Sequence, residues 1–232
     1  MQKYILVAFF TLFAFKVFAQ DIPLMEAVDD TWRFQELKNG KNFIAPESIA
    51  GNPYLEREFK KGELDSKETF HFPPLLLRYN IYTDNIECKT ADGKIYALKD
   101  QYKITDYKIG DTTFIYSPYF EKKNKIKSGY FQVLVPGKVT GLIRYKVYLI
   151  PATPEKPYTP AKPQHFSEIV RTYYIKTGNN PAQAVTNEKS LVKLFPNQKK
   201  QISRFIKNEK IRLQKQNDFA KVIRYLNTLQ SQ

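Results

Sequence analysis

Apolar and polar residues alternate along most of the middle of the chain, which is the pattern of half-buried β-strands. In residues 75–82, one predicted strand face carries Leu75, Leu77, Tyr79 and Ile81. Asp92-Gly93 separates two further alternating runs and predicts a tight hairpin. Gly110-Asp111 and Pro136-Gly137-Lys138 mark similar turns. We expect eight to ten strands between residues 42 and 178.

The predicted fold class is α+β. Its main part is a predominantly antiparallel β meander, closed as a barrel or folded as a sandwich. The clear connections are hairpins and no helical crossover separates the strands, which argues against a parallel sheet.

Residues 151–163 interrupt the strand pattern with five prolines in 13 residues. Proline supplies no ladder donor, so this stretch cannot be an interior strand and should run extended. Val170–Lys176 has the composition of a strand that returns to the same sheet. This favours a long hairpin connection over a domain linker or a separate partner-binding loop.

After Gly178 the apolar spacing changes from two to about 3.6 residues, the period of an α-helix. Short helices are predicted over Lys189–Phe195, Asn197–Asn208 and Phe219–Leu229, with Asn217 as the N-cap of the last one. Such short helices need a packing partner. We therefore expect residues 187–232 to pack on the β domain as two or three helices.

The first residues have the composition of a secretory signal peptide. Lys3 precedes an apolar block of 12 residues, Tyr4–Phe15, and Val17 and Ala19 are small residues at the −3 and −1 positions. The block is too short for an ordinary membrane span, and no later segment is apolar enough to form one. Residues 1–19 are thus predicted to be removed on export to the periplasm or beyond, and residues 20–41 form an N-terminal segment without a clear pattern.

The net charge is +14, and removal of Lys3 and Lys16 leaves +12. Residues 187–232 contain eleven basic and three acidic residues, so most of this charge lies in the helical segment. A cationic field attracts anionic surfaces. The expected partner is an anionic envelope component or another protein, with no nucleic acid expected for an exported chain. The candidate binding residues are Lys199, Lys200, Arg204, Lys207, Lys221 and Arg224.

Motifs for catalysis are missing from the sequence. It contains no nucleophile elbow, zinc-binding helix, phosphate-binding loop or dinucleotide motif. Two histidines and the single Cys88 give no expected metal, cofactor or catalytic site, and Cys88 shares a predicted strand face with Ile86, which favours burial. These features favour a non-enzymatic binding protein.

Two other functions remain open at this point. A hydrolase acting on envelope polymers could use a pair of the turn carboxylates, which are Asp84, Asp92, Asp100, Asp106 and Asp111. A wide barrel could carry a small ligand. Alternating polar and aromatic residues could also form a stacking surface for sugars, made of Arg78, Tyr79, Tyr82, Arg144, Tyr145, Lys146 and Tyr148.

Residues 77–87, with the sequence LRYNIYTDNIE, follow a Lys-Gly pair at Lys61-Gly62. Together with a helical tail that contains Tyr225 and Asn227, they resemble a group of uncharacterised secreted proteins of the Bacteroidota. Leu226 and Cys88 replace aromatic residues typical of that group. The resemblance implies architecture and location, and it transfers no catalytic residues.

Signal processing gives the first testable prediction. Protein purified from the cell envelope fraction should begin at Gln20, because the basic start, apolar block and small residues direct cleavage after Ala19. Intact-mass measurement checks this. A mature species that still contains residues 1–19 would show the prediction to be wrong.

Overall fold

The structure is a computed structural model that describes residues 34–36, 49–66, 74–98, 101–121, 125–158 and 160–230. The predicted signal peptide and most of the N-terminal segment lie outside these residues. The elements that build the sheet are β1 (Phe34–Glu36), β2 (Lys60–Ser66), β3 (Leu75–Asn80), β4 (Asn85–Lys89), β5 (Ile95–Leu98), β6 (Ile104–Ile109), β7 (Thr112–Phe120), β8 (Ile126–Val135), β9 (Val139–Lys146), β12 (Val170–Thr177) and β13 (Gln183–Ala184), with a 3₁₀ turn, η1, at Gln101–Lys103 before β6.

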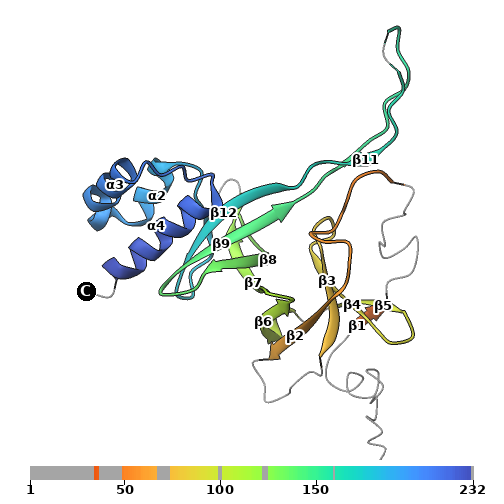
Figure 1. Cartoon of the computed structure of the whole chain (residues 1–232), viewed down its shortest axis with the longest axis horizontal. Helices are drawn as coiled ribbons and strands as arrows, with labels where there is room; N and C mark the ends of the chain where they lie inside the picture. Colours follow the sequence, from red (N-terminus) through yellow and green to blue (C-terminus); the bar gives the residue numbers. More distant parts are fainter. Residues whose placement is uncertain are drawn as a thin grey trace, which may run out of the picture.

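These strands form one antiparallel sheet that curls into a half-barrel (Figure 1), so the α+β class with a predominantly antiparallel sheet is confirmed. The strand order is β1-β5-β4-β3-β2-β6-β7-β8-β9-β12-β13. Among the described strands, β1 and β13 remain as separate edges. The sheet is therefore neither a closed barrel nor a two-sheet sandwich.

One connection departs from the predicted meander. β2 lies between β3 and β6, so the chain passes from β5 through η1 to the far side of β2 before it continues as β6. The hairpins at Asp92-Gly93, Gly110-Asp111 and Pro136-Gly137-Lys138 are confirmed by pairing of the strands on either side. Alternation within strands predicts hairpins but carries no signal for this longer-range pairing.

The proline-rich stretch is a hairpin connection, as expected. β9 and β12 pair along their full lengths, and the chain between them leaves the sheet through β10 (Leu149–Ile150) and returns through β11 (His165–Phe166). Figure 1 shows the intervening residues as a narrow arm that projects away from the body. The single strand predicted over Val139–Ile150 is thus divided into β9 and β10.

Three helices follow the sheet: α2 (Glu188–Leu194), α3 (Lys199–Asn208) and α4 (Gln216–Leu229), with a 3₁₀ turn, η3 (Pro196–Gln198), before α3. Asn187 caps α2 through a reciprocal pair of hydrogen bonds with Ser190. The prediction that Asn217 caps the last helix is wrong. The backbone of Lys215 is extended and its carbonyl accepts from the Phe219 N–H, so α4 begins at Gln216.

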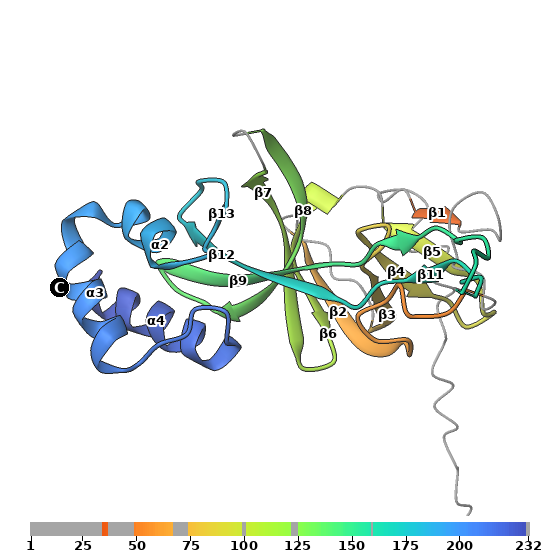
Figure 2. The same ribbon diagram turned by 90° about the horizontal axis from the view of Figure 1, so that it is seen from above.

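The helices cover the end of the sheet formed by β9 and β12 (Figures 1 and 2). The ring of Phe219 stacks on that of Tyr173, with centroids 4.8 Å apart. Ile223 packs on Gly141, where an added Cβ would lie 2.7 Å from the Ile223 side chain. A residue larger than glycine at this position would push α4 away from the sheet.

A partly buried polar contact fixes the same helix to the β8–β9 turn. The Asn227 side chain accepts a hydrogen bond from the Val139 N–H at 2.9 Å and donates to the Val139 carbonyl at 2.8 Å. Its amide also donates to the Ile223 carbonyl within α4. One side chain therefore connects residues that are 88 positions apart in the chain.

Most buried apolar side chains belong to one continuous core to which both the curled sheet and the helices contribute. Its centre is aromatic: the Tyr130 ring lies 5.0 Å from the rings of both Tyr107 and Tyr116 and 5.8 Å from that of Tyr79. A smaller cluster, made of Tyr119, Phe131, Leu142, Tyr174 and Ala182, lies on the opposite face of the sheet. Side chains thus fill the inside of the half-barrel.

Replacement of Asn227 by alanine tests how α4 is held. The change leaves the Val139 amide without its side-chain acceptor and should lower the free energy of unfolding by about 1–3 kcal/mol. Urea unfolding measures the difference. The neighbouring exposed variant Thr228→Ala is the control and should differ from wild type by about 0.5 kcal/mol or less. Equal stabilities of the two variants would show that the Asn227 contact contributes nothing.

Candidate functional site

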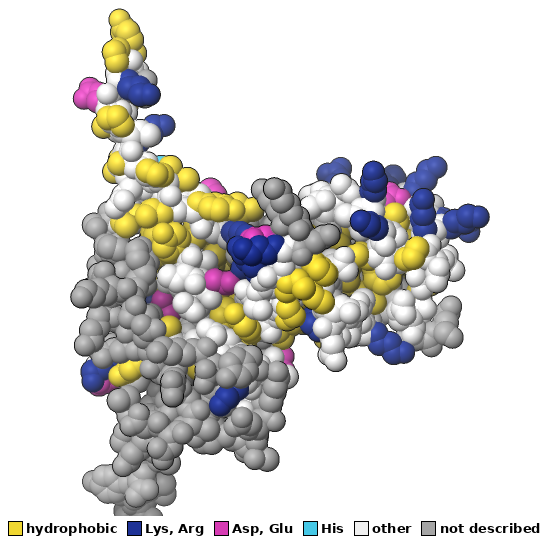
Figure 3. Space-filling model, turned by 180° about the vertical axis from the view of Figure 1, so that it is seen from behind, with side chains coloured by type: hydrophobic (Ala, Val, Ile, Leu, Met, Phe, Trp, Pro, Cys, Tyr) yellow, Lys and Arg dark blue, Asp and Glu magenta, His cyan; other side chains and the backbone are white. Residues whose placement is uncertain are grey.

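The candidate site predicted from the sequence is a basic surface on the helical segment. All six candidate residues are exposed: Lys199, Lys200, Arg204 and Lys207 on α3, and Lys221 and Arg224 on α4. The other five basic residues of the segment are also exposed, namely Lys189, Lys193, Lys210, Arg212 and Lys215. We call these eleven side chains the basic helical end. Figure 3 shows dark-blue side chains gathered over this part of the molecule.

The packing of the helices explains this exposure. On α3, Ile202 and Ile206 are buried, so the basic residues on the other side of the helix point to solvent. On α4 the buried stripe contains Phe219, Val222, Ile223 and Leu226. The rings of Phe205 and Tyr225 stack 4.1 Å apart and join α3 to α4. The same apolar contacts that hold the helices together therefore present their charges outward.

The charges of the basic helical end are not neutralised locally. None of the eleven side chains forms an ion pair with another residue that the structure describes. Two of the three acidic residues of the segment are engaged elsewhere: Glu188 accepts from the Ser203 hydroxyl and Asp218 from the Arg212 backbone N–H. The surface can therefore attract an anion without first breaking a salt bridge.

The basic helical end also lacks apolar side chains that could insert into a lipid layer. The described large hydrophobic residues that are exposed all lie on the sheet or the arm: Leu76, Tyr82, Ile126, Tyr148, Ile150, Tyr158 and Val170. Contact through the helices would therefore be electrostatic. No helix among the described residues is long and apolar enough to cross a bilayer.

The four turn carboxylates that the structure describes do not converge on a cleft. Asp92 is exposed and pairs with Lys94 within its own turn, and Asp111 is exposed at the β6–β7 turn. Asp106 lies opposite Asp65 on the neighbouring strand, and partial burial, followed by the charge of Asp65, raises the pKa of Asp106. Asp100 lies outside the described residues.

Asp84 belongs to the structural framework of the protein. Its carboxylate accepts from Arg144 Nη2 at 2.7 Å and from the Tyr79 hydroxyl at 2.7 Å. Arg144 also donates to the Tyr130 carbonyl and lies over the Tyr119 ring, 4.5 Å from its centroid. Burial, followed by the adjacent Asp84, raises the pKa of Tyr79 well above its ordinary value, which keeps this hydroxyl a donor.

A second buried arginine lies on β3. Arg78 donates to Glu87 through Nε at 3.1 Å and through Nη2 at 2.6 Å, and the other Glu87 oxygen accepts from Asn80 at 2.7 Å. The rings of Tyr54 and Phe59 lie 3.6 Å and 4.1 Å from the Arg78 guanidinium carbon. With its polar partners and two aromatic rings in place, this charge is held rigidly and is not free for a ligand.

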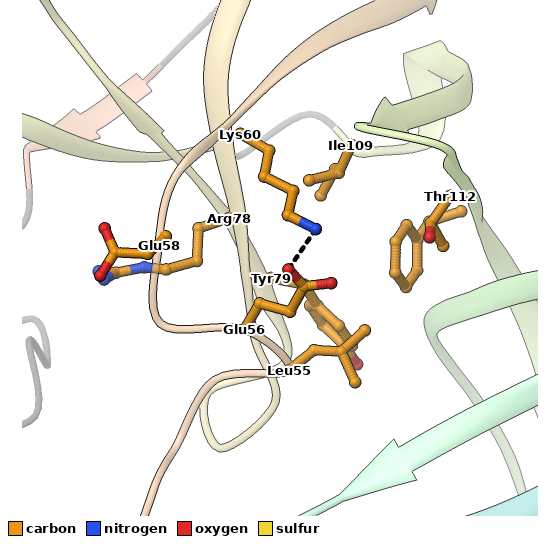
Figure 4. Close-up of a pocket in the computed structure, with 9 residues that line it drawn as sticks. Leu55, Glu56, Glu58, Lys60, Arg78, Tyr79, Ile109 and Thr112 are labelled. Carbon is orange, nitrogen blue, oxygen red and sulfur yellow. Dashed lines mark ion pairs between the residues drawn. The ribbon is translucent and has the colours of Figure 1, made fainter.

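The pocket beside Arg78 is small. Figure 4 shows it lined by Arg78, Tyr79 and neighbouring side chains, with Lys60 paired to Glu56. Its volume is about 20 Å³, enough for a single water molecule. Three larger depressions of about 560, 420 and 470 Å³ are open to solvent.

The stacking surface predicted from strand alternation is not present as one surface. Four of its seven residues are buried: Arg78, Tyr79, Arg144 and Tyr145. Tyr82 packs edge-on against Phe166, and Tyr148 lies at the base of the arm. These side chains are buried because both faces of β9 and, except at Leu76, of β3 are covered, whereas strand alternation alone takes one face to be solvated.

Within the described residues, no cluster of three or more histidine, cysteine, aspartate or glutamate side chains could hold a metal ion. Comparison with protein-family models, with curated proteins and with solved structures found no significant match to this chain. The resemblance to secreted Bacteroidota proteins therefore stays a prediction.

Cys88 provides a chemical test of the core. It is buried, as predicted, and burial raises the pKa of its thiol to about 12. Because the thiolate is the reactive form, labelling of the native protein by a maleimide at neutral pH should be at least about a hundredfold slower than after denaturation. Labelling followed by mass spectrometry measures both rates. Equal native and denatured rates would place Cys88 at the surface.

Proposed function

We propose that this chain is a non-enzymatic exported protein that binds an anionic surface of the cell envelope through the basic helical end. The observation that carries the proposal is the set of eleven exposed basic side chains without ion-pair partners among the described residues. Phosphate groups of lipids or lipopolysaccharide supply the complementary charge. The predicted signal peptide supports a site of action outside the cytoplasm.

The way the helices are held supports this role. α4 is fixed to the sheet by the Phe219–Tyr173 stack and by Asn227, and α3 is joined to α4 through Phe205. The charges therefore project from a preorganised surface. Little backbone entropy is lost when such a surface meets its partner.

The two alternative functions, a hydrolase and a small-ligand carrier, have less support. A hydrolase needs two carboxylates about 5–10 Å apart across a bound substrate, and Asp84 is engaged by Arg144 and Tyr79. A carrier needs an enclosed cavity of about 300 Å³ or more, whereas Tyr107 and Tyr130 fill the inner face of the described sheet and the larger depressions are open to solvent. The surface hypothesis needs no rearrangement of this core.

Co-sedimentation with lipid vesicles tests the proposal. The mature chain should bind vesicles of phosphatidylglycerol and phosphatidylcholine at low salt and leave vesicles of phosphatidylcholine alone unbound. Binding should weaken steeply as salt rises, because exposed charges are screened beyond about 8 Å at physiological ionic strength. A variant in which Lys199, Lys200, Arg204 and Lys207 are all replaced by glutamate should lose about 1 kcal/mol of membrane-binding free energy per residue. Its partitioning onto the anionic vesicles should therefore fall by about a thousandfold.

A charge-matched control separates a local surface from net charge. Reversal to glutamate of the exposed residues Lys61, Lys89, Lys94 and Lys125 changes the total charge equally but leaves the basic helical end intact. This variant should retain most of the binding. If the wild type fails to bind at low salt, or if both variants lose binding to the same degree, the proposal is wrong.

A further inference from the structure

The arm between β10 and β11 projects from the body as a two-stranded ribbon (Figure 1). Every described residue from Pro151 to Gln164 is exposed, and the tip residue Tyr158 is fully exposed. The backbone of Tyr158 has a positive φ of 65°, a conformation that costs free energy for a non-glycine residue. The chain thus holds a large aromatic side chain at the most remote point of the arm.

The arm contains a tandem repeat. Residues 151–156 read PATPEK and residues 157–162 read PYTPAK, each with the pattern Pro-x-Thr-Pro-x-Lys, and Pro163 follows. Prolines therefore recur at every third position, 151, 154, 157, 160 and 163. Three residues per turn is the period of polyproline II, so this spacing aligns prolines along each limb.

The backbone of the arm is poorly suited to strand addition. Between its described limbs, Thr153 and Lys162 exchange a pair of backbone hydrogen bonds, at 2.9 and 3.0 Å. Proline has no N–H, and its presence on an edge blocks pairing with a further strand. A partner must therefore recognise the side chains of the arm, because it cannot pair with the backbone of the arm as an added β-strand.

The base of the arm is firmly anchored. Leu149 pairs with Phe166 in the short β10–β11 ladder, and the Phe166 N–H donates to the Ala50 carbonyl at 2.8 Å. The Phe166 ring is buried and meets Tyr82 edge-on. The direction of the arm is thus fixed by the body, while its fixed proline φ angles limit the entropy lost on binding.

We infer that the arm is a docking element that inserts into an aromatic-lined groove with an acidic rim on a partner protein. Aromatic grooves recognise the ridges of regularly spaced prolines. Lys156 and Lys162 outnumber the single Glu155, so the arm carries a net positive charge. Acidic side chains at the rim of the groove would complement this charge. Tyr158 supplies the kind of exposed aromatic anchor that dominates binding energy at interfaces.

Site-specific photocrosslinking in the native host tests the inference. The full chain carries benzoylphenylalanine in place of Tyr158, and a second version carries it in place of Ile126, an exposed apolar residue on β8. The arm position should give a discrete crosslinked protein that the β8 position does not give. Mass spectrometry should map the crosslink to a surface of that protein rich in aromatic and acidic residues.

Binding of the purified partner to the full chain then supplies the decisive measurement. Tyr158→Ala, and the triple change of Pro154, Pro157 and Pro160 to alanine, should each weaken binding at least about tenfold. Ile126→Ala should leave binding unchanged. Thermal unfolding should be the same for all variants, because the substituted residues are exposed.

Three results would overturn the inference. The first is a Tyr158 crosslink to a second copy of this chain, which would make the arm a self-association element. The second is the absence of any product specific to the arm. The third is a partner whose affinity does not respond to the proline and tyrosine substitutions.

Discussion

The ion pair between Asp84 and Arg144 connects two distant parts of the curled sheet. Asp84 lies in the β3–β4 turn and Arg144 lies on β9, five strand positions away in the sheet order. The Arg144 side chain crosses β8 at Gly129, where an added Cβ would collide with Nη1, so only glycine lets the guanidinium pass. Loss of one partner would leave the other charge poorly compensated and would lower the free energy of unfolding. Breaking a buried ion pair costs about 3–5 kcal/mol, and we expect the lower end of this range because the Asp84 side chain is 27% exposed.

The most distinctive sequence of the chain encodes this framework. Within LRYNIYTDNIE, Arg78, Asn80 and Glu87 form one buried network across the β3–β4 hairpin. Tyr79 and Asp84 form a second one that reaches Arg144. The two networks pair most of these buried polar groups, although Arg144 Nε has no hydrogen-bond partner among the described residues. They fix the register of a hairpin with apolar residues on both faces. A motif of this kind specifies a fold and carries no information about a reaction.

Much of the local structure could be predicted from the sequence. Alternation and turn residues predicted the hairpins, and the 3.6-residue period predicted the helices and the outward direction of Lys199 and Arg224. These features depend on neighbours in the chain. The insertion of β2 between β3 and β6 could not be predicted in this way, because it depends on pairings between residues that are far apart in the chain, such as Gly62 and Ile109.

Burial of Arg78 and Arg144 was missed for a different reason. Strand alternation assigns a polar residue to a solvated face, and only the partners of these arginines, contributed by other strands and loops, make burial tolerable. In the observed β3–β4 hairpin Arg78 and Glu87 lie directly across from each other, so the register of that hairpin, which was not predicted, is what brings the opposite charges together.

The two proposed recognition surfaces lie at the extremities of this molecule. Tyrosine and phenylalanine rings fill the inner face of the sheet, the pocket beside Arg78 has room for about one water molecule, and the larger depressions are open to solvent. The helices and the arm extend from opposite ends of the paired strands β9 and β12 (Figure 2). A rigid sheet that separates a cationic surface from a proline-rich arm can hold two partners apart at a fixed spacing. The ion pairs Arg78–Glu87 and Arg144–Asp84 connect separate parts of that sheet and oppose its bending.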